Sequence, residues 1–306
     1  DIIDMYLRFL RSNVDIKPGI RVGIDCGNGM VGIAAPQILK EFGCDATELY
    51  ITPDGTFPNH HPDPTVEENV EELIHTVKEK KLQLGIGFDG DGDRVGVVDE
   101  NGNIIWGDML VVILSRDILS RIPGAKVIGD VKCSGRLFKD IEKHGGNPIM
   151  WKTGHSLIKS KMKLEKAALA GEMSGHIFFA DKFFGYDDAL YAALRLLEII
   201  SKTGKKVSEL LEGIPPAIST PEIRVDCPEE IKFKVVEKVK EEFRRGYEIV
   251  DIDGVRVEFP DGWGLVRASN TQPALVLRFE AQTQERLKEI RSLIEGKLEE
   301  AKKKLN

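Results

Sequence analysis

The sequence has few cysteines, no long apolar run and no excess of positive charge. Its 4 cysteines are scattered without a C-x-x-C pair, at Cys26, Cys44, Cys133 and Cys227. This favours reduced thiols in a cytoplasmic protein over a disulfide framework. No apolar run approaches the ~18 residues that span a bilayer, so we expect no membrane partner. The net charge of −7 argues against a nucleic-acid partner.

What the chain does contain is enough sequence for several hydrophobic cores. Its 306 residues, 42% hydrophobic and 30% charged, suffice for two or three domains of ordinary composition. We expect two similar α/β domains with mixed sheets, at 1–103 and 104–215. An α+β domain with an antiparallel sheet should follow at 216–306, after the prolines Pro215 and Pro216.

The first block alternates strands with helices. The expected strands are 21–25, 45–51 and 82–88, and the expected helices are 33–42 and 66–80, with a proline-rich loop at 53–64. Such an order predicts an α/β sheet, and α/β sheets bind ligands beyond the carboxyl ends of their strands. A helix face already under way at Ile2 and Ile3 leads us to expect further chain upstream.

The second and third blocks are expected to differ from each other. The second should contain helices at 109–119, 135–143 and 187–200 and strands at 126–131, 148–151 and 167–172. The third should contain a helix at 231–244, strands at 248–252, 255–259, 263–268 and 274–281, and a final helix with Thr283 as its N-cap. Strands joined by short turns predict the antiparallel sheet of this third block.

The most informative motif is the loop 89–94, which reads Asp-Gly-Asp-Gly-Asp-Arg. It follows 82–88, whose alternating apolar residues predict a half-buried strand, and precedes a second strand at 95–98. Three carboxylates at alternate positions, separated by glycines, can converge on one cation. Because all three are oxygen ligands, they favour Mg²⁺ or Ca²⁺ over zinc.

Three other interpretations of this loop were weighed. An acidic surface loop is disfavoured, because interleaved glycines cost stability unless the backbone needs them. An EF-hand is excluded, because Arg94 occupies the position that needs glycine and strands flank the loop. A phosphatase in which Asp89 is the nucleophile and Asp91 the second acid stays open.

Two further loops carry candidate binding groups. The segment 267–273 combines a guanidinium, hydroxyls and an amide in a tight loop between two strands, which suits a phosphate. The segment 171–176 places Glu172 and Ser174 two residues apart, which suits vicinal sugar hydroxyls. An ordinary polar turn stays the alternative for each loop.

Taken together, these three motifs resemble the α-D-phosphohexomutase family, closest to its phosphomannomutase/phosphoglucomutase branch. Asp-Gly-Asp-Gly-Asp-Arg resembles the family's metal loop, Gly-Glu-Met-Ser-Gly-His its sugar loop and Arg-Ala-Ser-Asn-Thr-Gln-Pro its phosphate loop. Their order and spacing resemble the family's second, third and fourth domains. The resemblance therefore implies a metal-binding domain at 1–103, a sugar-binding domain at 104–215 and a phosphate-binding domain at 216–306.

The resemblance also implies roles for individual residues. Those implied to hold Mg²⁺ are Asp89, Asp91 and Asp93. Those implied to be catalytic are Arg94, His155 and Lys132. Those implied to bind substrate are Lys132, His155, Glu172, Ser174, His176, Arg267, Ser269, Asn270 and Thr271.

The activity implied by the resemblance is interconversion of hexose 1-phosphates and 6-phosphates, with a hexose 1,6-bisphosphate as intermediate and activator. A phosphoserine carries the phosphoryl group in this family, in a Thr-Ala-Ser-His-Asn-Pro-like loop that these 306 residues do not contain. We therefore expect the family's first domain, its phosphoserine and one metal ligand to be missing here, and the chain alone to be inactive. A Mg²⁺-dependent sugar-phosphate phosphatase and a non-catalytic sugar-phosphate binder stay as alternatives.

Overall fold

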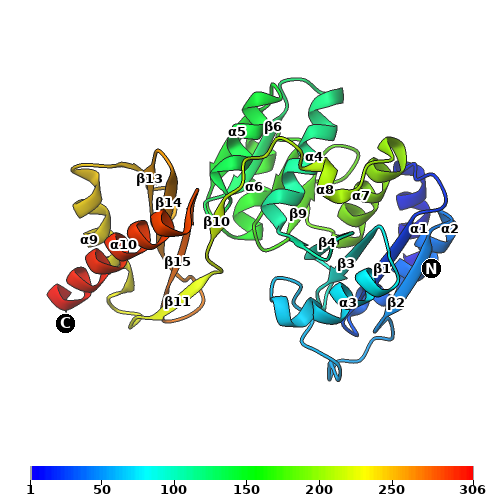
Figure 1. Cartoon of the computed structure of the whole chain (residues 1–306), viewed down its shortest axis with the longest axis horizontal. Helices are drawn as coiled ribbons and strands as arrows, with labels where there is room; N and C mark the ends of the chain where they lie inside the picture. The colour runs from blue at the N-terminus through cyan, green and yellow to red at the C-terminus, as the bar shows by residue number, and fades with distance from the viewer. Residues whose placement is uncertain (1, 306) are drawn as a thin grey trace. The chain divides into compact units, whose positions relative to one another are not determined.

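The computed structural model describes residues 2–305, which form two compact units (Figure 1). The first unit contains the described residues before Ser134 together with Leu137–Met150 and Gly154–Gly213. The second contains Ser134–Arg136, Trp151–Thr153 and the described residues from Ile214 onward. Over residues 2–305, no helix combines the length and apolar character needed to cross a membrane.

The first sheet of the first unit has 5 strands in the order β2-β1-β3-β4-β5. Their bounds are Arg21–Asp25 (β1), Asp45–Leu49 (β2), Leu84–Phe88 (β3), Val95–Asp99 (β4) and Ile104–Ile105 (β5). The helices of this part are Ile2–Asn13 (α1), Ala35–Glu41 (α2) and Glu71–Glu79 (α3). β1 runs parallel to β2 and β3, whereas β3 pairs antiparallel with β4, so the sheet is mixed as predicted.

The prediction that β3 is half-buried is wrong. All five of its residues are buried, because α3 covers the face that carries the glycines. A Cβ built on Gly85 would lie 2.8 Å from Val77 Cγ2 and 2.9 Å from Leu73 Cδ1. Glycine at this position therefore lets the helix approach the strand closely, and β3 becomes a rigid mount for the acidic loop that follows it.

The second sheet of the first unit has 4 strands in the order β7-β6-β8-β9. Its strands are Lys126–Asp130 (β6), Asn147–Trp151 (β7), Leu169–Gly171 (β8) and Ile177–Phe179 (β9), and its helices are Gly107–Arg121 (α4), Gly135–Lys143 (α5), His155–Glu165 (α6), Ala189–Thr203 (α7) and Val207–Leu210 (α8). The sequence patterns predict neither α6 nor β9. Only Ile158 and Met162 of α6 are buried, so its apolar period is weak, and β9 is only three residues long.

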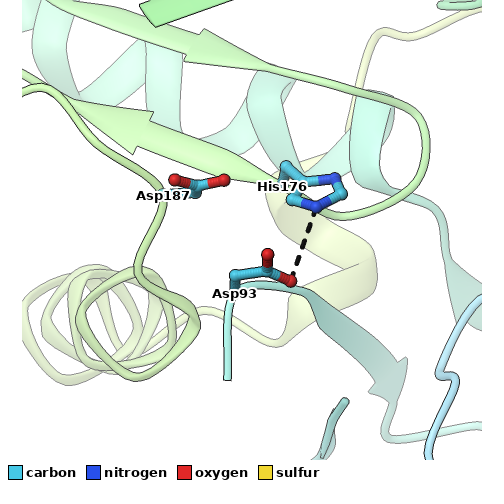
Figure 2. A group of neighbouring side chains, drawn as sticks. All are labelled: Asp93, His176 and Asp187. Atoms are coloured by element: carbon cyan, nitrogen blue, oxygen red, sulfur yellow. Dashed lines mark ion pairs between the residues drawn. The ribbon is translucent and has the colours of Figure 1, made fainter. Parts of the chain in front are cut away.

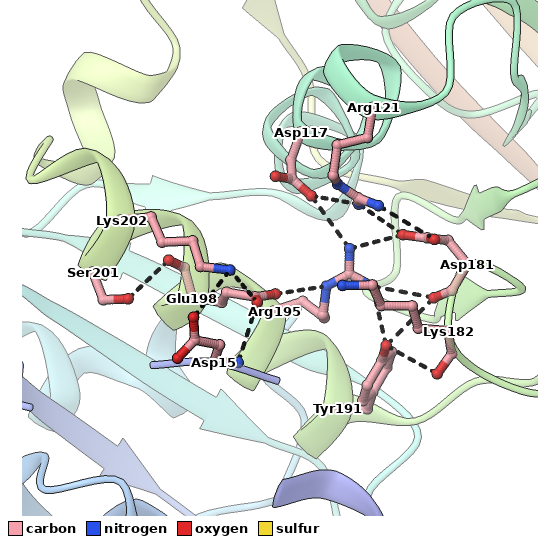
Figure 3. Close-up of polar contacts among 10 residues, drawn as sticks. All are labelled: Asp15, Asp117, Arg121, Asp181, Lys182, Tyr191, Arg195, Glu198, Ser201 and Lys202. Carbon is pink, nitrogen blue, oxygen red and sulfur yellow. Dashed lines mark hydrogen bonds and ion pairs between the residues drawn. The ribbon is translucent and has the colours of Figure 1, made fainter. Parts of the chain in front are cut away.

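A buried charge network on α7 ties the parts of the first unit together (Figure 3). Arg195, whose side chain is 1% exposed, lies 3.0 Å from Asp181 beyond β9 and 3.3 Å from Asp117 on α4. Its Nε lies 3.3 Å from Glu198, and Glu198 Oε1 accepts a hydrogen bond from the backbone N–H of Asp15. One arginine therefore links two helices with the loop after β9, and through Glu198 with the segment after α1.

The second unit is built on an antiparallel sheet in the order β10-β15-β14-β13-β12, with β11 also paired to β15. Its strands are Ile218–Ser219 (β10), Ile223–Asp226 (β11), Glu248–Val250 (β12), Val255–Phe259 (β13), Gly262–Ala268 (β14) and Ala274–Ala281 (β15). Helices Lys232–Arg244 (α9) and Gln284–Leu305 (α10) pack on each other and on this sheet (Figure 1). The core between them is aliphatic and aromatic, with Val239, Phe243, Leu277, Phe279 and Ile294.

The predicted cap of the last helix is confirmed. Thr283 Oγ1 accepts a hydrogen bond from the backbone N–H of Arg286 at 3.2 Å, the bond that an N-cap side chain supplies. The short strands β10 and β11 are not among the predicted elements. With mixed α/β sheets followed by an antiparallel α+β unit, the predicted fold class is confirmed.

Candidate functional site

The acidic loop between β3 and β4 is organised by its first carboxylate. Asp89 is 1% exposed, and its Oδ1 accepts backbone hydrogen bonds from Gly92, Asp93 and Arg94 at 3.0, 3.0 and 3.1 Å. Asp91 is exposed and Asp93 is half-buried. The loop is therefore wrapped around the buried carboxylate of Asp89.

The loop after β1 supports the acidic loop from one side. The backbone N–H of Met30 donates to Gly90 O at 2.9 Å. A Cβ on Gly29 would lie 2.8 Å from the carbonyl oxygens of both Asp89 and Gly90, so only glycine allows this approach. Two loops at the carboxyl ends of neighbouring parallel strands thus form one layer.

The three carboxylates suit a hard cation. One oxygen each of Asp89, Asp91 and Asp93 lies within 4.8 Å of the others, and oxygen ligands are those that Mg²⁺ and Ca²⁺ prefer. Burial and the neighbouring Asp93 raise the pKa of Asp89 to about 6. A cation bound among these oxygens would offset this crowding of negative charge.

Arg94 ends the loop between two carboxylates. Its Nε donates to Asp89 Oδ2 at 2.8 Å, and its Nη1 lies 3.0 Å from Asp63 Oδ1. Asp63 belongs to the proline-rich segment and is not among the predicted site residues. The sequence signal that could have indicated it is its place directly before Pro64, which disfavours a helical backbone at Asp63.

The structure brings the sugar-loop motif against the acidic loop. The backbone N–H of Val95 donates to Gly175 O at 3.1 Å, and Arg94 and His176 form a β-bridge. His176 Nε2 lies 3.4 Å from Asp93, and Figure 2 shows this ion pair with Asp187 nearby. The two motifs lie far apart in the sequence, at 89–94 and 171–176, and together form one site in the fold.

His176 carries a positive charge between the two motifs. Its Nδ1 lies 3.0 Å from Glu172, opposite the contact of its Nε2 with Asp93. Burial lowers the pKa of His176, but the hydrogen bonds and charges of Asp93 and Glu172 outweigh burial and raise it to about 9. The sequence motif alone did not indicate this bridging contact.

Glu172 is fixed from both sides. It is 2% exposed, and its Oε1 accepts the backbone N–H of Gly154 at the start of α6. Ser174 Oγ lies 3.4 Å from Glu172 Oε2. Burial raises the pKa of Glu172, but His176 outweighs burial and holds it below the ordinary value.

The two other predicted residues of this unit lie around the same loops. Lys132, after β6, is 6% exposed, and its charge helps to lower the pKa of Glu172. His155 begins α6 and is exposed, and its ring stacks on that of His176 with centroids 5.9 Å apart. Asp187 lies 3.5 Å from His155 Nδ1 and 3.0 Å from Lys159 Nζ. Metal-loop and sugar-loop residues are thus gathered in the first unit.

A pocket of about 400 Å³ borders the acidic loop within this unit. Its lining combines four carboxylates, those of Asp91, Asp93, Asp187 and Asp188, with apolar side chains that include Ile2, Ile3, Met30, Val31, Ile33, Ala34 and Leu190. Two of the three candidate metal ligands, Asp91 and Asp93, therefore line this pocket.

The phosphate-loop motif lies in the second unit, between β14 and β15. Arg267 is 6% exposed, and its Nε donates to Asp253 Oδ2 at 3.0 Å. Ser269 is also buried, and its Oγ accepts the backbone N–H of Gln272 at 3.2 Å. Asn270 and Thr271 are exposed. The side chains predicted to hold a phosphate therefore surround one tight turn.

A buried lysine supports this turn and is not among the predicted residues. Lys232, 1% exposed, donates to the carbonyl oxygens of Ser269 at 2.6 Å and Gln272 at 3.1 Å. The same ammonium group forms an ion pair with Glu229, with Lys232 Nζ 2.7 Å from Glu229 Oε2. One sequence signal could have indicated this residue. Lys232 stands in the first turn of a helix, at a position on the helix face that packs inward.

Models of three domains of one protein family match the chain. "Phosphoglucomutase/phosphomannomutase, alpha/beta/alpha domain II" matches residues 4–102, and domain III of the same family matches residues 106–218. "Phosphoglucomutase/phosphomannomutase, C-terminal domain" matches residues 222–297. Together these matches cover most of the chain.

Individual relatives agree with these matches. A phosphomannomutase/phosphoglucomutase of Pseudomonas aeruginosa is 49% identical over 299 residues, which cover 97% of this chain and 65% of the relative. A phosphoglucomutase of Neisseria gonorrhoeae is 49% identical over 302 residues, with 98% and 65% covered. The crystal structure of a phosphoglucomutase/phosphomannomutase family protein of Burkholderia thailandensis superimposes with a TM-score of 0.92 at 42% identity, covering 99% of this chain and 65% of that one. The chain thus spans about 65% of the length of these relatives.

Proposed function

This chain belongs to the phosphoglucomutase/phosphomannomutase family, and we propose that it is the metal-, sugar- and phosphate-binding core of a phosphohexomutase. The proposed reaction is the interconversion of hexose 1-phosphates and 6-phosphates, an intramolecular phosphoryl transfer. The observation that carries the proposal is the contact of the acidic loop with the sugar-loop motif through His176. A metal site and a hydroxyl-binding site in direct contact are what phosphoryl transfer to a sugar requires.

Asp89, Asp91 and Asp93 are the proposed ligands of Mg²⁺. The ion, when bound, would offset negative charge on the phosphoryl group in transfer. Arg94, fixed at the end of the same loop, would place a second positive charge beside that group. Both positive charges would lie beside the phosphoryl group in transfer. They would therefore stabilise the negative charge that develops there in the transition state more than they stabilise the bound substrate.

The sugar is proposed to lie against the sugar-loop motif of the first unit, with Lys132 and His155 beside it. Glu172 would accept hydrogen bonds from sugar hydroxyls, and Ser174 and His176 would contact the same ring. Lys132 and His155 would contact substrate at the reacting end, with His155 as the proposed proton carrier. The positions of Glu172 and His176 are set before substrate binds, which supports this role.

The second unit is proposed to hold the phosphate that is not reacting. Arg267, Ser269, Asn270 and Thr271 would bind it through charge and hydrogen bonds, whichever end of the sugar carries it. Such a site suits a cycle in which a hexose 1,6-bisphosphate, the proposed intermediate and activator, presents either phosphate in turn. The rigid support of the turn by Lys232 agrees with this role.

The phosphoryl carrier is proposed to lie outside these 306 residues. The sequence contains no loop like the family's phosphoserine loop, so a phosphoserine domain would be a partner of this chain and the chain alone would be inactive. We further propose domains at 1–103, 104–215 and 216–306. The free thiols of all 4 cysteines support the proposed cytoplasmic location.

The phosphatase alternative finds no support in the site geometry. A nucleophilic Asp89 would need an oxygen directed at substrate. Its Oδ1 accepts three backbone N–H groups, and its Oδ2 accepts Arg94 Nε. Both oxygens of Asp89 are thus engaged in organising the loop, and the relatives that match the chain are named as mutases.

The proposed function predicts binding of a hexose phosphate without its hydrolysis. In ³¹P NMR with Mg²⁺, glucose 6-phosphate should bind the full chain, and inorganic phosphate should not accumulate. R267M should weaken binding about tenfold or more, because a charged hydrogen-bonded contact contributes about 1.5–3 kcal/mol. The matched control is R291M, because Arg291 is an exposed arginine of α10 paired with Glu295. Steady release of inorganic phosphate would favour the phosphatase instead.

A further inference from the structure

The proline-rich segment at 53–64 has no part in the function proposed so far, yet it contacts the proposed catalytic arginine. Asp63 Oδ1 lies 3.0 Å from Arg94 Nη1. The Nε of the same guanidinium donates to Asp89 Oδ2 at 2.8 Å. Two nitrogens of Arg94 are therefore held by two carboxylates from different parts of the chain, and its side chain is only 25% exposed.

Asp63 is itself rigidly held. Its Oδ1 accepts hydrogen bonds from the backbone N–H and the hydroxyl of Thr65 at 3.0 and 2.6 Å. Its carbonyl oxygen accepts from Asn69 Nδ2 at 3.0 Å. Pro64, directly after it, disfavours the helical region for its backbone. The carboxylate that faces Arg94 is thus fixed through its backbone and through its own oxygen.

The two neighbouring prolines are seated on glycines around the metal loop. A Cβ on Gly27 would lie 2.8 Å from Pro62 Cβ, and a Cβ on Gly96 would lie 2.7 Å from Pro64 Cβ. Any larger residue at either position would push the proline away. The segment 62–64 is therefore attached to the loop after β1 and to β4, beside the metal loop.

The charge of Asp63 agrees with this geometry. Burial raises the pKa of Asp63, but its bonds to Thr65 and the charge of Arg94 outweigh burial and hold it below the ordinary value. Asp63 is therefore ionised at neutral pH and can attract the guanidinium as a full anion.

We propose that Asp63 is a positioning residue that fixes the direction of the Arg94 guanidinium beside the metal loop. The catalytic consequence rests on the role proposed above for Arg94. Without Asp63, the side chain would keep partners only at Nε, which lies 2.8 Å from Asp89 and 3.9 Å from Asp93, and the guanidinium could rotate about that end. Misplacement of a charged group by about 1 Å costs on the order of 100-fold in rate.

The same segment supplies a matched control. Asp54 Oδ1 accepts hydrogen bonds from the backbone N–H and the hydroxyl of Thr56 at 2.9 and 2.7 Å. This turn has the same bonding pattern as that of Asp63 and Thr65, but it is exposed. Matched substitutions at Asp54 and Asp63 therefore change the same kind of local turn in the same way, and only those at Asp63 remove a carboxylate from Arg94.

The first test uses the metal-free full chain and the arginine Nε–H signals in ¹H–¹⁵N NMR. The Arg94 signal is assigned by its loss in R94K. D63A and D63N should shift this signal and speed its exchange with water, whereas D54A and D54N should leave it unchanged. D63N retains an oxygen for Thr65, so the fold should persist in that variant. An Arg94 signal that is the same in the Asp63 and Asp54 variants would overturn the proposal.

The second test measures turnover after a family member's phosphoserine domain is added to the full chain. D63A should lower kcat about tenfold to 100-fold with little change in KM, because Arg94 acts on the phosphoryl group in transfer and not on the sugar. D54A should retain wild-type values. An unchanged kcat in D63A would also overturn the proposal. If the wild-type mixture shows no turnover, the proposed function fails, and the NMR test still decides the role of Asp63.

Discussion

R195M is expected to lower the free energy of unfolding by about 3 kcal/mol. Removing one partner from a buried ion-pair network leaves the carboxylates that it paired with buried and without a compensating charge. Arg195 is 1% exposed and contacts Asp117, Asp181 and Glu198 (Figure 3). Its guanidinium also lies 4.7 Å from the centre of the Phe179 ring. Methionine keeps much of the packing volume but none of the charge. Urea unfolding at pH 7 measures the difference.

The control for this prediction is R121M. Arg121 pairs with two of the same carboxylates, Asp117 and Asp181, but its side chain is 35% exposed. Because exposed pairs are screened by water, we expect a loss of less than about 1 kcal/mol. Equal losses in the two variants would contradict the importance of the buried arginine.

The pH dependence of the R195M effect has a definite sign. Burial raises the pKa of Asp181, but Arg121 and Arg195 outweigh burial and hold it below 3.8. The stability that this carboxylate contributes is present above its ordinary pKa and is lost as the pH falls through its folded value. The difference between R195M and wild type should therefore shrink below about pH 4.

E172Q is expected to loosen the junction between the sugar-loop motif and the acidic loop. Glutamine can still accept the backbone N–H of Gly154, but it presents no negative charge to His176. Burial lowers the pKa of His176, but Asp93 and Glu172 outweigh burial and raise it to about 9. Without the charge of Glu172, this pKa should fall toward 6.5. Titration of the His176 ring by NMR in the metal-free chain measures this change, and E295Q is the control, because Glu295 lies on α10 and pairs with Arg291.

The same variant should change the pH profile of stability. The raised pKa of His176 means that its contribution is fully present below pH 6.5 and is lost as the pH rises through about 9. The lowered pKa of Glu172 means that its contribution is present above 4.5 and is lost as the pH falls through the folded value. Between pH 6.5 and 9, the free energy of unfolding should therefore decline less steeply in E172Q than in the wild type. E172Q should also weaken glucose 6-phosphate binding about tenfold. An unchanged decline would contradict the bridge.

Local patterns predict most of the scaffold. The bounds of β1, α5, β13 and β15 agree with the sequence expectation to the residue, because each is a clear alternating or amphipathic run. The prediction that β3 is half-buried is wrong. The glycines that alternate with its apolar residues face a helix rather than water. The short strands β10 and β11 pair with β15, which is distant in sequence, and β9 is only three residues long, so no local period marks any of them.

The candidate site divides in the same way. Residues that carry distinctive chemistry at fixed spacing, such as the three aspartates of the acidic loop, can be found from the sequence alone. Their supporting partners cannot, because Asp63, Lys232 and Asp253 are ordinary residue types whose contacts form only in the folded chain. The bridge by His176 is of the same kind, since it joins Asp93 and Glu172 across two loops.

The most direct test of the central claim is conversion of glucose 1-phosphate to glucose 6-phosphate. The assay contains Mg²⁺ and glucose 1,6-bisphosphate, and compares the full chain with and without the phosphoserine domain of a family member. We expect conversion only when both are present, and not with that domain alone. Equal conversion by this chain alone would contradict it, because the phosphoryl carrier would then lie within these 306 residues.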